Sequence, residues 1–174
     1  MSDNDKVAEL HTSKGEIDIH FLPGVAPNHV KNFLELAEKG FYNGTKFHRV
    51  IPGFMVQGGD PNTVSGSPST WGMGGAPAKV KAEFNKIHHA RGIVSMARSQ
   101  DPNSASSQFF IVVGDSGFLD GQYSVFGHVT KGMEVADAIV AGKRDASDRP
   151  AEPVSIDSIK IRPATDAEKA ASPK

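Results

Sequence analysis

The chain has 174 residues, which is long enough for one domain with a sizeable apolar core. Its formal net charge is -1 and no block of Lys or Arg stands out, so neither nucleic acid nor a membrane surface is expected as a partner. Cysteine is absent, which excludes disulfides and thiolate metal sites. Residues 1–6 are polar and no apolar run follows them, so we expect a cytoplasmic protein.

Short runs of alternating apolar residues predict a chain made mostly of β-strands. These runs cover residues 7–11, 16–21, 46–51, 54–58, 93–97, 108–112, 125–129 and 154–161. Two helices are predicted, one over residues 27–39 and one over residues 133–141. Many short strands with two helices favour an all-β barrel or sandwich with capping helices. Residues 164–174 lack large apolar side chains, so we expect a single domain over residues 1–163 and a disordered tail.

The stretch around Arg49 brings one guanidinium, one amide and several large apolar groups close together. Side chains alternate along a strand, so Met55 and Gln57 project from the same face. Desolvating a guanidinium is costly unless its donors find partners, although an edge arginine can instead pack its stem and keep its head in water. The pairing of Gln with Phe recurs downstream at Gln108 and Phe110, which suggests one pocket shared by two strands.

Four segments carry a family resemblance. They are residues 47–60 (FHRVIPGFMVQGGD), 95–97 (SMA), 107–111 (SQFFI) and 118–121 (FLDG). In this order they resemble the cyclophilin-type peptidyl-prolyl cis-trans isomerases, in a bacterial-like single-domain form, and the similarity runs over residues 7–161. The resemblance implies a mostly β fold, a closed eight-stranded antiparallel β-barrel capped by two α-helices, and a monomer without sheet edges.

The same resemblance implies an isomerase that rotates Xaa-Pro bonds in proline-containing polypeptides, assists folding and uses no cofactor or metal. Arg49 matches the catalytic donor of the family. Matches to its apolar proline pocket and to the adjoining groove for residues that precede proline are Phe54, Met55, Gln57, Ala97, Arg98, Ser99, Gln108, Phe110, Phe118, Leu119 and Tyr123. Phe118 and Tyr123 sit where many relatives carry Trp and His, and Arg98 replaces an Asn of well-known eukaryotic members. Because Phe118 has no N–H donor, cyclosporin is expected to bind weakly.

Two other functions deserve comparison with an active isomerase. One keeps the fold and the proline pocket but acts only as a peptide-binding or chaperone module; the presence of Arg49 and of the pocket aromatics argues for activity. The other is a serine hydrolase, because residues 114–117 (GDSG) resemble the nucleophile segment of chymotrypsin-like proteases, with Ser116 as the nucleophile. The Gly-Pro that follows in that family is missing, and a turn explains the tetrapeptide without chemistry.

Two further segments are candidates for ligand binding. The adjacent His88 and His89 should point in different directions and have no third ligand nearby, so we expect exposed histidines in a loop and no metal site. Residues 72–75 (GMGG) suggest a phosphate loop, but no Gly-Lys-Ser or Gly-Lys-Thr follows them. The Gly-rich stretch 61–78 is therefore expected to be a mobile surface loop.

Overall fold

A computed structural model describes residues 6–173. Its strands are β1 (Lys6–Thr12), β2 (Gly15–Phe21), β3 (Arg49–Ile51), β4 (Met55–Gly58), β5 (Ile93–Met96), β6 (Phe109–Val112), β7 (Val125–Lys131) and β8 (Ile156–Pro163). Its helices are α1 (Pro27–Glu38), α2 (Asn62–Ser65), α3 (Met133–Ala141) and α4 (Asp166–Ala170), with 3-10 turns η2 (Pro68–Thr70) and η3 (Gly117–Leu119). The predicted strands and both predicted helices are confirmed, with small differences at their ends.

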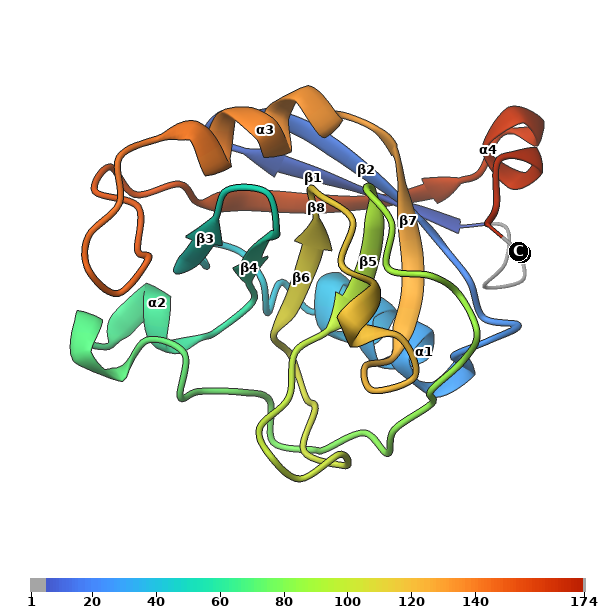
Figure 1. The fold of residues 1–174 in the computed structure, drawn as a ribbon, viewed down its shortest axis with the longest axis horizontal. Helices are drawn as coiled ribbons and strands as arrows, with labels where there is room; N and C mark the ends of the chain where they lie inside the picture. The colour runs from blue at the N-terminus through green and yellow to red at the C-terminus, as the bar shows by residue number, and fades with distance from the viewer. Residues whose placement is uncertain (1–5, 174) are drawn as a thin grey trace.

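The eight strands form one antiparallel sheet that curls around the core (Figure 1). The strand order is β3-β4-β6-β5-β7-β2-β1-β8, so β3 and β8 are the two edge strands of this sheet. The mostly β fold with eight antiparallel strands is therefore confirmed. The pairing of β3 with β4 and of β4 with β6 sets the two strands around Arg49 beside the strand of Phe110.

The main core lies between the concave face of the sheet and helix α1. The apolar residues of β1 and β2 are fully buried there. Asp18 and His20 of β2 are buried as well, so the half-exposed strand that the alternating sequence predicted is wrong for β2. Phe33 of α1 packs against Tyr42 with ring centroids 4.8 Å apart, against Phe109 at 5.4 Å and against Phe126 at 5.6 Å. These rings are inside the molecule, and together they attach α1 to strands β6 and β7. Among residues 6–173, no helix is long and apolar enough to cross a bilayer.

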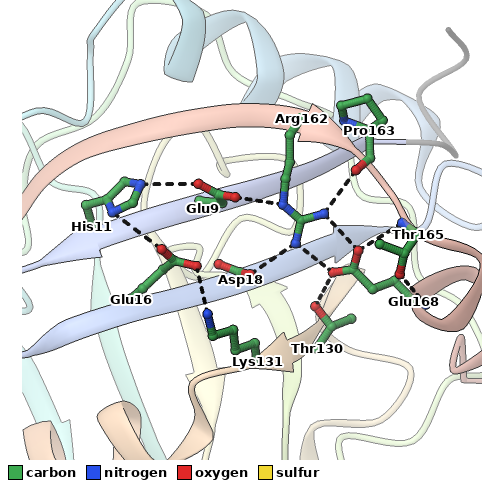
Figure 2. Close-up of polar contacts among 10 residues, drawn as sticks. All are labelled: Glu9, His11, Glu16, Asp18, Thr130, Lys131, Arg162, Pro163, Thr165 and Glu168. Carbon is green, nitrogen blue, oxygen red and sulfur yellow. Dashed lines mark hydrogen bonds and ion pairs between the residues drawn. The ribbon is translucent and has the colours of Figure 1, made fainter.

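The chain end differs from the disordered tail that the sequence predicted, because residues 166–170 form helix α4. Thr165 and Glu168 cap this helix reciprocally: the Thr165 hydroxyl accepts from the Glu168 amide at 3.1 Å, and the Glu168 carboxylate accepts from the Thr165 amide at 2.9 Å. The guanidinium of Arg162 makes ion pairs with three carboxylates (Figure 2). It lies 2.8 Å from Glu168 of α4, 2.7 Å from Glu9 of β1 and 3.1 Å from Asp18 of β2. Ion pairs thus attach α4 to strands β1 and β2. Because this segment has few apolar side chains, its composition alone did not predict an ordered helix.

The Arg162 cluster generates a stability prediction. We expect Arg162→Gln to lower the free energy of unfolding by about 2–3 kcal/mol, because it leaves the buried carboxylate of Asp18 without its cation. The measurement is urea unfolding at neutral pH. The matched control Arg144→Gln removes an exposed pair with Asp148 and should cost less than about 0.5 kcal/mol. Equal losses in the two variants would refute the anchoring role of Arg162.

Candidate active site

The β3–β4 hairpin places Arg49 directly across from Gln57. Its turn contains Gly53 with a φ of 76°, a left-handed conformation that glycine adopts without a steric penalty. Side chains directly opposite on an antiparallel pair share one face, and here Nη1 of Arg49 donates to Oε1 of Gln57 at 3.5 Å. Arg49 is exposed, as an edge arginine would be, but Gln57 gives its guanidinium a fixed partner.

A chain of side-chain amides determines which atom of Gln57 faces Arg49. The amide nitrogen of Gln108 donates to two carbonyl oxygens, those of Gly72 at 2.9 Å and Gly74 at 2.8 Å. The remaining atom, Oε1 of Gln108, accepts from Nε2 of Gln57 at 2.9 Å. Because an amide has one acceptor and one donor end, these bonds turn Oε1 of Gln57 toward the guanidinium.

Asp60 holds the Gly-rich loop that supplies those two carbonyl oxygens. Its carboxylate is fully buried and accepts from the backbone amides of Asn62 at 2.8 Å, Gly72 at 2.5 Å and Gly74 at 3.2 Å. Hydrogen bonds from N–H groups to an ionised carboxylate are among the stronger ones in proteins. The stretch 61–78, expected to be a mobile loop, is thus attached to the site at several points.

A small cavity with both apolar and polar side chains in its walls lies beside Arg49. Its volume is about 110 Å³, and its lining residues are Arg49, Phe54, Met55, Gln57, Ala97, Arg98, Phe110, Leu119 and Tyr123. All nine belong to the site that the sequence predicted. The β3–β4 hairpin, strand β6, the segment after β5 and the stretch from η3 to Tyr123 contribute them, so four separate parts of the chain converge on one cavity.

Phe110 forms one wall of this cavity because β6 alternates its side chains between two apolar clusters. Phe109 points into the main core, while Phe110 belongs to a second cluster with Met55 and Leu119. The ring of Tyr123 meets that of Phe110 edge to face, with centroids 5.8 Å apart. The predicted division of β6 into a core face and a pocket face is therefore confirmed.

A buried polar network supports the same ring from behind. The imidazole of His89 stacks on Phe110 with centroids 6.2 Å apart, and its two nitrogens lie 2.9 Å from Oδ1 of Asp120 and 3.0 Å from Oγ of Ser95. Burial lowers the pKa of His89, which favours the neutral ring. The expectation of two exposed histidines is wrong for His89 and right for His88, because adjacent residues face opposite ways.

A second and larger cavity continues from the first. Its volume is about 360 Å³. Gln57, Ala97 and Arg98 line both cavities, so the two form one groove. The predicted site residues Ser99 and Gln108 lie in the second cavity, together with Lys79, Ser104, Ser106, Met73 and Ala76, which the sequence did not single out.

Phe118 occupies the rim rather than the interior of the groove. Its side chain is 67% exposed and packs against Phe54, with ring centroids 5.4 Å apart. It lines neither of the two cavities. All twelve predicted site residues are therefore gathered at one groove, and Phe118 is the one that stands at its edge.

The geometry around Ser116 does not support hydrolysis. Ser116 is 1% exposed, and its hydroxyl donates to the carbonyl oxygen of Gly114 at 2.8 Å. The ring nitrogens of His89 are both engaged, one by Asp120 and one by Ser95, and Ser95 is itself fully buried. An activated serine needs a base within hydrogen-bond reach and access for a substrate. Within residues 6–173 no basic side chain bonds the Ser116 hydroxyl, and its burial leaves a substrate no access.

One group of side chains among residues 6–173 has spacing that suits a metal ion. Glu9, His11 and Glu16, on the β1–β2 hairpin, each place a ligand atom within 4.8 Å of the others. Arg162 contacts Glu9 at 2.7 Å and Lys131 contacts Glu16 at 3.6 Å, so both carboxylates have protein cations beside them (Figure 2). None of these residues lines the groove.

Comparison with known proteins places the chain in one family. Residues 7–161 match the family model described as cyclophilin type peptidyl-prolyl cis-trans isomerase/CLD. Peptidyl-prolyl cis-trans isomerase A of Dickeya dadantii is 46% identical over 161 residues, which are 87% of this chain and 82% of the relative. Peptidyl-prolyl cis-trans isomerase ppi1 of Schizosaccharomyces pombe is 43% identical over 151 residues, which are 85% of this chain and 94% of the relative.

The solved structures agree with the sequence comparisons. A cyclophilin type peptidyl-prolyl cis-trans isomerase of Cryptosporidium parvum, crystallised in the presence of the dipeptide Ala-Pro, superposes with a TM-score of 0.82. It is 32% identical, and the match covers 90% of this chain and 98% of that one. The chain therefore belongs to the cyclophilin-type peptidyl-prolyl cis-trans isomerase family.

Proposed function

We propose that this cyclophilin rotates Xaa-Pro peptide bonds with the proline ring in the cavity of about 110 Å³ and with Arg49 as the catalytic donor. The observation that carries the proposal is the guanidinium of Arg49 at the wall of a small cavity, opposite apolar side chains such as Phe110 and beside the side-chain carbonyl oxygen of Gln57. The Ala-Pro dipeptide used with the Cryptosporidium parvum relative supports a proline-containing ligand for this cavity.

The chemistry of the reaction explains why an arginine and an apolar pocket suffice. The barrier of about 18–20 kcal/mol is the loss of amide resonance as the bond twists. In the twisted state the proline nitrogen becomes pyramidal and regains a lone pair. A fixed donor near that nitrogen binds the twisted state more strongly than either planar isomer, which is the condition for catalysis. The apolar walls meanwhile hold the ring so that the rest of the chain rotates.

No proton is transferred in this mechanism, and His48 takes no part in it. His48 precedes Arg49 and is buried, whereas Arg49 is exposed. Burial lowers the pKa of His48 and favours its neutral form. A guanidinium offers N–H donors and no acceptor, so as a donor it needs no base to activate it.

We also infer that the curled sheet closes into a barrel, which favours a monomer because no open edge remains. Backbone bonds between the chain before β3 and the beginning of β8 support this inference. The amide of Phe47 donates to the carbonyl of Val154 at 3.0 Å, and that of Gly44 donates to the carbonyl of Ile156 at 2.7 Å. The amide of Ile156 donates in turn to the carbonyl of Thr45 at 2.7 Å.

Arg49→Ala should lower kcat/KM for a proline-containing tetrapeptide by roughly 10²–10³, or about 3–4 kcal/mol, because the twisted amide loses its donor. Arg49→Lys should recover little, since a single ammonium cannot serve Gln57 and the substrate with a planar fork. A protease-coupled assay measures both variants, and circular dichroism verifies that they are folded. A folded Ala variant with activity within a few-fold of the unmodified chain would show that Arg49 is not the catalytic donor.

Cyclosporin inhibition tests the rim of the groove. Phe118 offers an apolar wall but no N–H, so an inhibitor carbonyl placed there has no donor. We expect Phe118→Trp to tighten inhibition about tenfold through one added hydrogen bond, while peptide turnover changes by less than about threefold. The exposed position of Phe118 leaves room for the larger ring. Superimposable inhibition curves for the two proteins would exclude Phe118 as the residue that limits cyclosporin binding.

A further inference from the structure

We propose that the cavity of about 360 Å³ selects substrates with an acidic side chain shortly before the proline, and that Arg98 and Lys79 make this selection. The inference rests on the proposed function, because it takes the proline to occupy the neighbouring cavity. It adds a substrate class to that function: segments of the type acidic-Xaa-Pro, in which the carboxylate enters the second cavity.

The two cavities are close enough to hold neighbouring residues of one substrate. Gln57, Ala97 and Arg98 line both, so the two cavities adjoin one another within one groove. An extended chain advances about 3.3–3.6 Å per residue, so a side chain one or two positions from the proline reaches the second cavity. The family resemblance of Ala97, Arg98 and Ser99 assigns this side of the groove to residues that precede the proline.

The charges around the second cavity have one sign. Lys79 and Arg98 are the two charged residues that line it, and within residues 6–173 no Asp or Glu does so. The hydroxyl of Ser106, which also lines the cavity, accepts from the amide of Ala76 at 3.1 Å and keeps its own hydrogen to donate to a carboxylate. A cavity with cations, neutral donors and no carboxylate favours an anionic side chain over a neutral or cationic one.

Arg98 is held in place before any substrate arrives. Its Nε donates to the carbonyl of Gln122 at 3.0 Å and its Nη1 to that of Ser99 at 2.9 Å. Its guanidinium carbon lies 4.7 Å from the ring centre of Tyr123 and 6.0 Å from that of Phe84. Nη2 makes no hydrogen bond with the described part of the chain and is available to a ligand. A preorganised guanidinium loses little conformational entropy when it binds a carboxylate.

The expected selectivity is modest because the cavity is open to solvent. Lys79 is exposed and Arg98 is half-buried, so water and salt screen both charges. Two such cations together should favour a Glu peptide over its Gln isostere by about three- to tenfold at low ionic strength. The same field should make a Lys peptide slower than the Gln peptide. The cavity would then discriminate among the Glu, Gln and Lys peptides by the charge of this side chain and not by its size.

The test uses proline tetrapeptides with blocked termini that differ only in Glu, Gln or Lys at the second position before the proline. The quantity measured is the ratio of kcat/KM for the Glu and Gln peptides at low and at high salt. We expect a ratio of about three to ten that falls toward one as salt is added. A second peptide pair carries Glu or Gln after the proline, and its ratio should be close to one.

Three variants locate the selectivity. Arg98→Gln should reduce the Glu to Gln ratio below about two, and Lys79→Gln should reduce it by a smaller factor. The matched control Lys14→Gln removes one positive charge from the exposed β1–β2 turn, outside the cavity, and should leave the ratio unchanged. Because the ratio compares two peptides on one protein, a general loss of activity or of folded protein cancels.

A Glu to Gln ratio of one in the unmodified chain would overturn the proposal, as would a ratio that survives in both Arg98→Gln and Lys79→Gln. Ordinary turnover of the Gln peptide in either case would leave the isomerase function intact. If none of the peptides were turned over, the isomerase proposal would fail. The ratio of dissociation constants for the same peptides, measured by fluorescence titration, would then still decide the charge preference.

Discussion

The orientation of the Gln57 side-chain amide determines whether the guanidinium of Arg49 has a hydrogen-bond acceptor in the groove. With its oxygen toward Arg49 it holds the guanidinium; with its nitrogen there, the two groups would present donors to each other. Gln108 sets this direction, because both hydrogens of its own amide are taken by carbonyl oxygens of the Gly-rich loop. The buried carboxylate of Asp60 holds that loop in turn, so Asp60 helps to orient Arg49, the proposed catalytic donor, through the loop and the two amides.

The fold protects this arrangement by separating the pocket from the main core. Phe109 and Phe110 are adjacent on β6, yet the first packs with α1 and the second with Met55 and Leu119. The strand is therefore fixed by one cluster while its other face remains open to a ligand. His89 stacks on the back of Phe110 and is itself bonded through both ring nitrogens. The face of Phe110 that is turned away from the cavity is thus packed against a hydrogen-bonded side chain.

The sequence predicts those features that depend on local pattern. Alternation along β4 and β6 correctly placed Gln57, Met55 and Phe110 at one pocket, and the proline and glycine beside residues 27–39 correctly marked helix α1. What it could not predict depends on contacts between distant segments. In the sequence Asp60 is only the last residue of the segment 47–60. In the structure its carboxylate accepts a hydrogen bond from the amide of Gly72, 12 residues later, and so holds the Gly-rich loop.

Helix α4 was missed for a related reason. Its sequence has little apolar surface to bury, and its attachment depends on Arg162 meeting carboxylates of β1 and β2 that lie about 150 residues earlier in the chain. Burial of His89 likewise followed from Asp120, which is 31 residues away. Such pairings leave no periodic signal, whereas strand faces do.

A double-mutant cycle between Gln108→Leu and Arg49→Ala tests the central claim most directly. Among the described residues Gln108 makes no hydrogen bond with Arg49, and the amide of Gln57 is the hydrogen-bonded link between them. The account predicts that Gln108→Leu lowers kcat/KM about tenfold when Arg49 is present and less than about twofold in the Arg49→Ala background. Equal losses in the two backgrounds would contradict the account, because the amide chain would then act on the substrate without orienting the arginine.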